Sequence, residues 1–146
     1  MTDFSPAWLS QRLVAASWDA IIVADREGTI RLWNAGAVEM FGYGPDEALG
    51  RSLDLIIPEN LRARHHEGYR RVMAAGVSKY AKDLLAVPGL TKDGRRISLE
   101  FTLTMVRDEA GQILGAAAII RDVTARWQRD RELQKRLAAM EAQLKG

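Results

Sequence analysis

Cysteine is absent from this chain of 146 residues. Its absence excludes disulfide bonds, thiolate metal sites, cysteine nucleophiles and chromophores attached through cysteine. Long apolar runs are also missing, since none approaches the roughly 20 residues that a membrane-spanning helix needs. Residues 1–6 contain neither a basic nor an apolar segment, so we expect no signal peptide. These absences predict a cytoplasmic protein that does not associate with a membrane.

The chain also lacks a strong excess of charge of one sign, because its formal net charge is only +2. Basic residues are enriched in 62–71 and 121–136, but both segments are interleaved with acidic residues. A nucleic-acid interface needs a concentrated basic patch. We therefore interpret both segments as solvated helix faces and expect no nucleic-acid partner.

The residue patterns of common catalytic sites are missing as well. The sequence contains no Ser–His–Asp order with supporting context, no His-x-x-x-His and no glycine-rich phosphate loop. Its two histidines, His65 and His66, are adjacent, and on a helix they point about 100° apart, which disfavours a shared metal. The sequence therefore predicts a protein that is not an enzyme.

The residues that are present are those of one globular domain, with 47% apolar and 27% charged side chains. Alternation, helical spacing and turn residues predict the secondary structure. The expected elements, in order, are a helix over 6–16, strands 20–25 and 29–33, short helices 35–40 and 45–50, a central helix 60–75, strands 79–87, 97–105 and 113–120, and a charged helix from 122. Turns are expected at 26–28, between the first two strands, and at Pro88-Gly89, after the third.

This order predicts an α+β fold with a five-stranded antiparallel sheet. Short helices would cover one face of the sheet, and amphipathic helices would flank it at both ends of the chain. The expected domains are an N-terminal flanking helix (1–17), a central domain (18–124) and a C-terminal helix (125–146). In the last helix, apolar residues recur at spacings of four, three and four, which is a short heptad pattern that would support a homodimer beside other contacts. These residues are Leu133, Leu137, Met140 and Leu144.

The central helix carries the candidate binding residues. Helical spacing places His65 on the apolar stripe with Tyr69 and turns His66 away from it. The small residues 115–118 would leave space above a flat cofactor, or would instead let a helix or a partner strand approach closely. The residues expected to line a cofactor pocket with the histidines and Tyr69 are Leu84, Leu85, Leu103, Met105, Ala117 and Ile119.

Several short motifs in this order resemble the PAS sensor domain. They are Ile22–Gly28 followed by Trp33-Asn34, then Phe41-Gly42-Tyr43, Glu47–Gly50, Lys92-Asp93-Gly94 and Arg121-Asp122-Val123-Thr124. Together they cover about residues 17–124. The resemblance implies a sensory or interaction module with a ligand pocket between the central helix and the sheet. It also implies that the terminal helices carry dimerisation and signal output, with a separate signalling protein as a possible partner.

Within the family, the segment 55–65 resembles the haem-binding PAS sensors of the FixL and Dos types. Their proximal histidine follows the proline by seven residues, which implies haem b ligated through His65. Alignment from Tyr69 would select His66 instead. Sensors of these types carry an arginine that stabilises bound oxygen or a methionine that ligates the iron. The corresponding positions in this chain fall near Leu85 and Asp83, so the usual hydrogen bond to oxygen is missing and carbon monoxide or nitric oxide is the expected gas. The alternative is a ligand-free adaptor that dimerises through its last strand and C-terminal helix.

Overall fold

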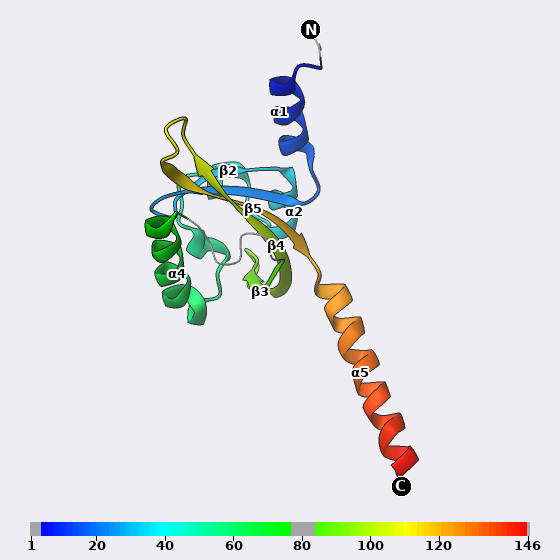
Figure 1. The fold of residues 1–146 in the computed structure, drawn as a ribbon. Coiled ribbons are helices and arrows are strands. Elements are labelled where there is room, and N and C mark those ends of the chain that lie inside the picture. Colours follow the sequence, from blue (N-terminus) through cyan, green and yellow to red (C-terminus); the bar gives the residue numbers. More distant parts are fainter. Residues whose placement is uncertain (1–3, 77–83, 146) are drawn as a thin grey trace.

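The structure, a computed structural model, describes residues 4–76 and 84–145. Its five strands form one antiparallel sheet in the order β2-β1-β5-β4-β3 (Figure 1). The predicted fold class is thereby confirmed. The expected methionine position, Asp83, and the first part of the expected strand 79–87 lie outside the described residues. The strands are β1 (Ala20–Asp25), β2 (Ile30–Trp33), β3 (Leu85–Leu90), β4 (Arg96–Arg107) and β5 (Ile113–Asp122).

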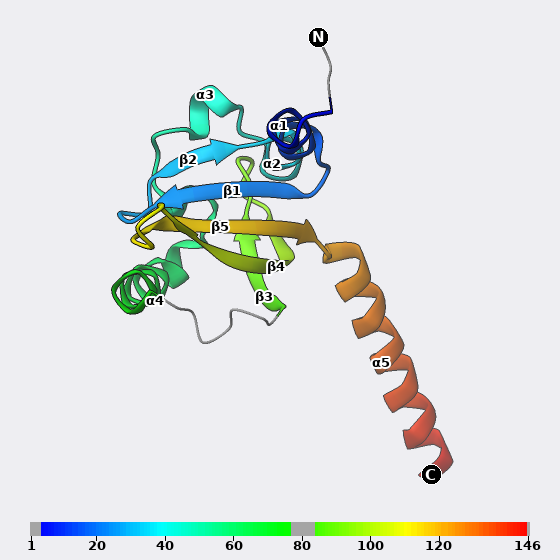
Figure 2. The same cartoon turned by 45° about the horizontal axis from the view of Figure 1, so that its top comes forward.

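Short helices connect the two halves of the sheet. They are α2 (Ala35–Phe41), α3 (Pro45–Ala48), the 3₁₀ turns η1 (Leu53–Ile56) and η2 (Glu59–Leu61), and the long helix α4 (Arg62–Ala75). Figure 2 shows α4 beside β4 and β5, near the turn that joins these two strands. The predicted central helix is therefore present, although its first residues form a 3₁₀ turn.

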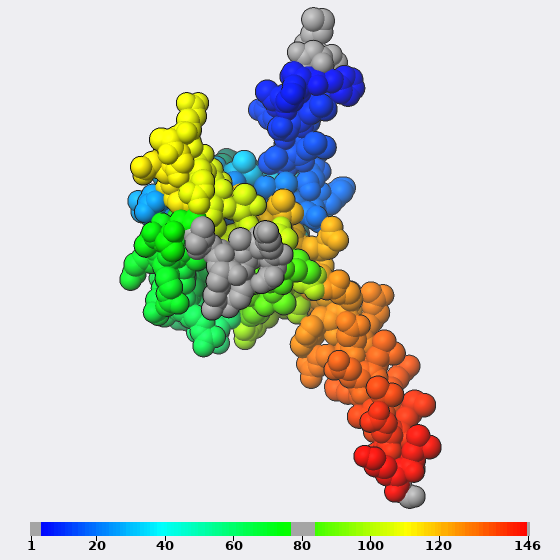
Figure 3. All heavy atoms as spheres, in the orientation of Figure 1, coloured from blue at the N-terminus to red at the C-terminus, as the bar shows by residue number. Residues whose placement is uncertain are grey.

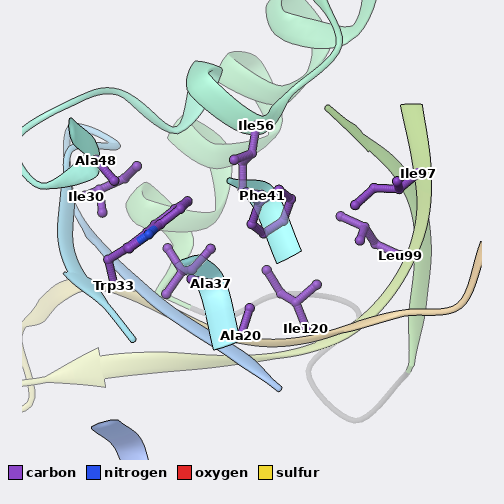
Figure 4. Packing of buried hydrophobic residues seen from close by; sticks show 11 residues of the cluster. Ala20, Ile30, Trp33, Ala37, Phe41, Ala48, Ile56, Ile97, Leu99 and Ile120 are labelled. Carbon is purple, nitrogen blue, oxygen red and sulfur yellow. The ribbon is translucent and has the colours of Figure 1, made fainter. Parts of the chain in front are cut away.

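One face of the sheet carries the core, as the alternation along β4 predicts. Ile97 and Leu99 are buried, whereas Thr102 and Thr104 on the opposite face are exposed. Around Phe41 of α2, apolar side chains from both halves of the chain meet, among them Trp33 and Ile56 (Figure 4). The indole of Trp33 also donates a hydrogen bond of 2.9 Å to the carbonyl of Tyr43. Trp33 is thus a core residue.

The edge strand β3 differs from the expectation. Pro88 and Gly89 were expected to form a turn, but both pair with β4 as strand residues, Pro88 with Ser98 and Gly89 with Ile97. Proline is tolerated there because β3 is an edge strand. A Cβ on Gly89 would lie 2.5 Å from the side chain of Leu99, so a larger residue at this position would have to displace Leu99. The turn prediction is therefore wrong, and contacts across the sheet are the reason.

Asn34 joins three elements at the start of the domain. Its Oδ1 accepts hydrogen bonds from the backbone N–H groups of Ile21 (2.8 Å) and Ala37 (3.0 Å), so it caps α2 and holds β1. Its amide nitrogen donates to the carbonyl groups of Val14, Ser17 and Asp19. One buried side chain thus fixes the end of α1 against the sheet.

The flanking helices α1 (Pro6–Ala16) and α5 (Thr124–Lys145) extend away from the sheet in opposite directions (Figures 1 and 3). The first turn of α5 is fixed, because Thr124 accepts a hydrogen bond from the N–H of Ser98 and Arg126 pairs with Glu100. Beyond it, the heptad side chains are between 57% and 87% exposed. The apolar side of α5 therefore has no covering within the described chain.

Candidate functional site

The helix α4 supplies most of the candidate site. Pro58 precedes its 3₁₀ entry turn, and Gly76 ends it in the left-handed conformation (φ 75°) that glycine adopts without steric cost. Only Met73 of α4 is buried. It packs with Ile113 and Ala116 of β5 in a small apolar cluster that attaches α4 to the inner face of the sheet.

Tyr69 holds α4 against the sheet through hydrogen bonds to the end of β1. Its hydroxyl donates to the carbonyl of Asp25 (2.6 Å) and lies 3.2 Å from that of Ala24. Burial and the nearby Asp25 carboxylate raise the pKa of Tyr69 to about 12. The hydroxyl therefore remains protonated at neutral pH and serves as a structural donor, while the phenol ring contacts the candidate site.

His65 lies one turn before Tyr69, and the two ring centroids are 5.8 Å apart. Burial lowers the pKa of His65, and the neighbouring His66 lowers it further, so the imidazole is neutral at pH 7. Its Nδ1 atom is buried and has no hydrogen-bond partner among residues 4–76 and 84–145. Such an atom is costly unless another group pairs with it, which singles out His65 as the side chain to examine for ligand binding.

His66 has a different environment. Its Nε2 lies 2.6 Å from Oδ1 of Asp54 on η1, and half of the His66 side chain is exposed. This contact ties α4 to the 3₁₀ turn. Because Asp54 occupies Nε2, only Nδ1 of His66 remains for a ligand.

A cleft of about 450 Å³ opens between α4, the turn that joins β1 to β2, and η1. This volume is in the range of small-molecule sites. The helix contributes His65, His66, Tyr69 and Arg70, the turn contributes Arg26, Glu27 and Gly28, and the start of η1 contributes Leu53 with its capping residue Ser52. Three of the residues predicted on α4, His65, His66 and Tyr69, thus line a cleft, and this cleft opens toward the β1–β2 turn.

The predicted pocket lining on the sheet needs correction. Ala117 and Ile119 lie on the outer face, where Ala117 pairs with Thr104 and Ile119 is 47% exposed. Successive strand residues point to opposite faces, so the inner-face residues are Ala116 and Ala118.

The remaining predicted lining residues are not at the cleft. Leu84 is 61% exposed, and Leu85 is half-buried at the start of β3. Leu103 and Met105 do face α4, but they pack against the cluster around Met73. They therefore fill the space that was expected to hold a flat cofactor.

The fit of haem to these residues is limited to the donor groups. The neutral imidazole of His65 suits iron, and Arg26 and Arg70 suit the acid groups of haem. The rim of the cleft is polar, however, and a haem-ligating histidine usually donates its second N–H to a partner, which the buried Nδ1 of His65 lacks within the described residues. A flat cofactor between α4 and the sheet would also displace Leu103 and Met105.

No other arrangement for metal chemistry emerges in the described parts of the chain. Residues 4–76 and 84–145 contain no group of three or more His, Asp or Glu side chains that could hold a metal ion.

Of the helices that the structure describes, none combines the length and apolar character required to cross a bilayer.

The comparisons with known proteins establish the family. A family model described as PAS fold matches residues 14–128. This chain belongs to the PAS family. PAS domains are sensory and signal-transduction modules, so the sequence resemblance is confirmed at the level of family and fold. A crystal structure of a PAS domain from Colwellia psychrerythraea, 24% identical, superposes with a TM-score of 0.72 over 83% of this chain and 99% of its own.

The curated relatives of this PAS domain are longer proteins. It is 31% identical to an uncharacterized protein of Azorhizobium caulinodans over 84% of this chain and 17% of the relative. It is 26% identical to the sensor protein FixL of Bradyrhizobium diazoefficiens over 80% of this chain and 23% of FixL. For the oxygen sensor protein DosP of Escherichia coli the identity is 25%, over 94% of this chain and 16% of DosP. The chain thus spans less than a quarter of the length of these relatives.

Sequence reasoning did not identify Arg26, which lines this PAS cleft, or Asp54, which contacts His66 beside it. Arg26 belongs to a motif that was interpreted only as a turn, and Asp54 lies in a segment without a clear pattern. Their roles depend on tertiary contacts, since Asp54 meets His66 across 12 positions and Arg26 meets Ile113 across 87. The adjacent charges at 25–27, directly before a turn glycine, were the available signal.

Proposed function

We propose that this PAS domain is a sensory module that binds a small ligand in the cleft between α4 and the β1–β2 turn. The observation that carries the proposal is His65. Its neutral ring lies at the wall of a ligand-sized cleft, and its buried Nδ1 lacks a partner among the described residues. The relatives FixL, a sensor protein, and DosP, an oxygen sensor protein, support a sensory role.

The same cleft offers a route to the output helix. Arg26 lines it and donates a hydrogen bond of 2.9 Å to the carbonyl of Ile113, the first residue of β5. The other end of β5 continues through Asp122, which accepts a hydrogen bond from the N–H of Thr124, into α5. A ligand that engages Arg26 would change the restraint on β5, and α5 would pass the change to a second copy or to a separate signalling protein.

Haem b is the candidate ligand that the resemblance implies. His65 would ligate the iron, and Arg26 and Arg70 would hold the acid groups. Bound haem would supply an iron centre to which a diatomic gas binds, with carbon monoxide or nitric oxide as the expected gas.

Absorbance spectroscopy with two histidine variants tests this assignment. The purified chain is titrated with haem, then reduced and exposed to carbon monoxide. We expect a sharp Soret band that moves at both steps, that is lost in His65→Ala and that is retained in His66→Ala. A spectrum that stays at the position of unbound haem would reject haem, and loss in His66→Ala alone would reject His65.

A ligand-free dimerisation adaptor is the second candidate, and a specific observation favours it. Large apolar side chains are exposed on the outer sheet face and along α5, including Ile119, Leu133 and Leu137. A second copy of the chain would cover both. Light scattering on the whole chain and on a form without residues 125–146 tests the role of α5. We expect a dimer that weakens on truncation, and an unchanged dimer would exclude α5 as the contact.

A further inference from the structure

We propose that the cleft beside α4 selects a ligand with a single carboxylate, which Arg26 and Arg70 bind while the apolar part of the ligand lies on Leu53 and the ring of His65. The inference rests on the proposed function, because it names the ligand class of the same cleft. It does not depend on haem.

The two arginines are the basic groups of the cleft without an acidic partner. Within residues 4–76 and 84–145, no carboxylate lies within ion-pair distance of Arg26 or Arg70. The acids nearby pair with other residues. Asp25 pairs with Arg31, Asp54 contacts His66, and Glu67 pairs with Arg71. Both guanidinium groups therefore keep donors for a carboxylate, the planar anion that arginine binds through two parallel hydrogen bonds.

The charge of the cleft indicates how many acid groups the ligand carries. Among the residues that line it, Glu27 is the one carboxylate and His65 is neutral, while the Asp54 carboxylate lies against His66 outside the lining. The lining therefore holds two guanidinium groups and one carboxylate. A ligand with one carboxylate balances the charges of this lining, whereas a phosphate or a dicarboxylate would bring an excess of negative charge beside Glu27.

The other walls suit an apolar ligand body. The ring centroids of His65 and Tyr69 are 5.8 Å apart, the ring planes are tilted by 32°, and Leu53 also lines the cleft. The Tyr69 hydroxyl is occupied by the carbonyl of Asp25, so Tyr69 offers its ring. Oγ of Ser52 accepts a hydrogen bond from the N–H of Asp54, and the hydroxyl hydrogen stays available for the ligand.

Such a ligand fits the structure without rearrangement. It occupies the open cleft and leaves the packing of Met73, Leu103 and Met105 intact. Arg26 uses Nη1 for the carbonyl of Ile113, and its remaining N–H groups can bind the carboxylate at the same time. Binding would then reach the start of β5 directly.

An NMR titration of the ¹⁵N-labelled chain with sodium benzoate tests the proposal. Benzamide has nearly the same shape without the charge, and sodium chloride at equal ionic strength controls for screening. We expect saturable shifts for the amides of 26–28, 52–53 and 65–70, together with Ile113, from benzoate alone. Arg70→Gln should weaken benzoate binding at least about fivefold, since an exposed charge-assisted contact is lost. Arg64→Gln, an exposed arginine of α4 outside the cleft, should leave it unchanged.

Equal responses to benzoate and benzamide, an unchanged affinity in Arg70→Gln, or shifts confined to other surfaces would each overturn the carboxylate assignment. Benzoate binding in a chain that shows no haem Soret band would support the carboxylate assignment and reject haem. Haem binding without a benzoate response would do the reverse, so the two proposals fail separately.

Discussion

Replacement of Asn34 by alanine should destabilise the whole domain, because one buried amide joins α1, β1 and α2. The substitution removes the α2 cap and leaves the N–H of Ile21 and three carbonyl groups without their partner. A lost cap costs about 1 kcal/mol, and each buried group left unpaired costs about 1 kcal/mol or more, less for carbonyls that water can reach. The expected loss in the free energy of unfolding is about 3 kcal/mol.

Urea unfolding followed by far-ultraviolet circular dichroism measures this loss. For a chain of this size it corresponds to a fall in Tm of roughly 10 °C, with an unchanged m-value. Asn60→Ala is the matched control, because Asn60 is exposed on η2, and it should change the free energy of unfolding by less than about 0.5 kcal/mol. A loss below about 1 kcal/mol in Asn34→Ala would refute the view that this amide holds the three elements together.

Three further changes test other parts of the structure. Gly115→Ala should destabilise the sheet by about 3 kcal/mol or more, because its Cβ would lie 2.0 Å from the carbonyl oxygen of Ala24. Gly68→Ala on α4 would place a Cβ with nothing within 4 Å, and it should stabilise the chain by about 0.5 kcal/mol. Thermal unfolding of both variants checks this contrast. Tyr69→Phe should cost about 1 kcal/mol in urea unfolding, since its hydrogen bond to the β1 carbonyl is lost, and an unchanged midpoint would contradict that role. The pKa of Tyr69 is raised to about 12 in the folded chain, against about 10 in the unfolded one. The free energy of unfolding that this residue contributes is therefore complete below about pH 10 and is lost between about pH 10 and 12. The free energy of unfolding should fall less over this pH range in Tyr69→Phe than in the original chain.

The alternating strands were predictable because their pattern is unambiguous. Along β4, Ile97 and Leu99 alternate with polar residues, so only one register buries the apolar face. The same rule could not orient β5. Residues 115–119 are all small or apolar, and both choices of face satisfy the pattern, so Ala117 and Ile119 were assigned to the wrong one. Pro88-Gly89 was predicted as a turn because local signals omit the pairing with β4.

The candidate site was predictable only on its helix. Helical spacing placed His65 at the wall of the cleft, since i, i+4 neighbours share a face and Tyr69 is such a neighbour. The other lining residues come from the β1–β2 turn and the start of η1, which tertiary packing brings to α4. A pattern of spacings within one segment contains no information on such contacts, and Arg26 and Asp54 were therefore missed.

Hydrogen exchange followed by mass spectrometry, with and without haem, most directly tests the claim that haem binds in the cleft beside His65 and that β5 and α5 respond to it. The account predicts slower exchange on haem addition in α4 and the β1–β2 turn, a change at the junction of β5 with α5, and the loss of both effects in His65→Ala. Exchange that is unchanged in α4 and the turn, or that changes equally in His65→Ala, would contradict the account.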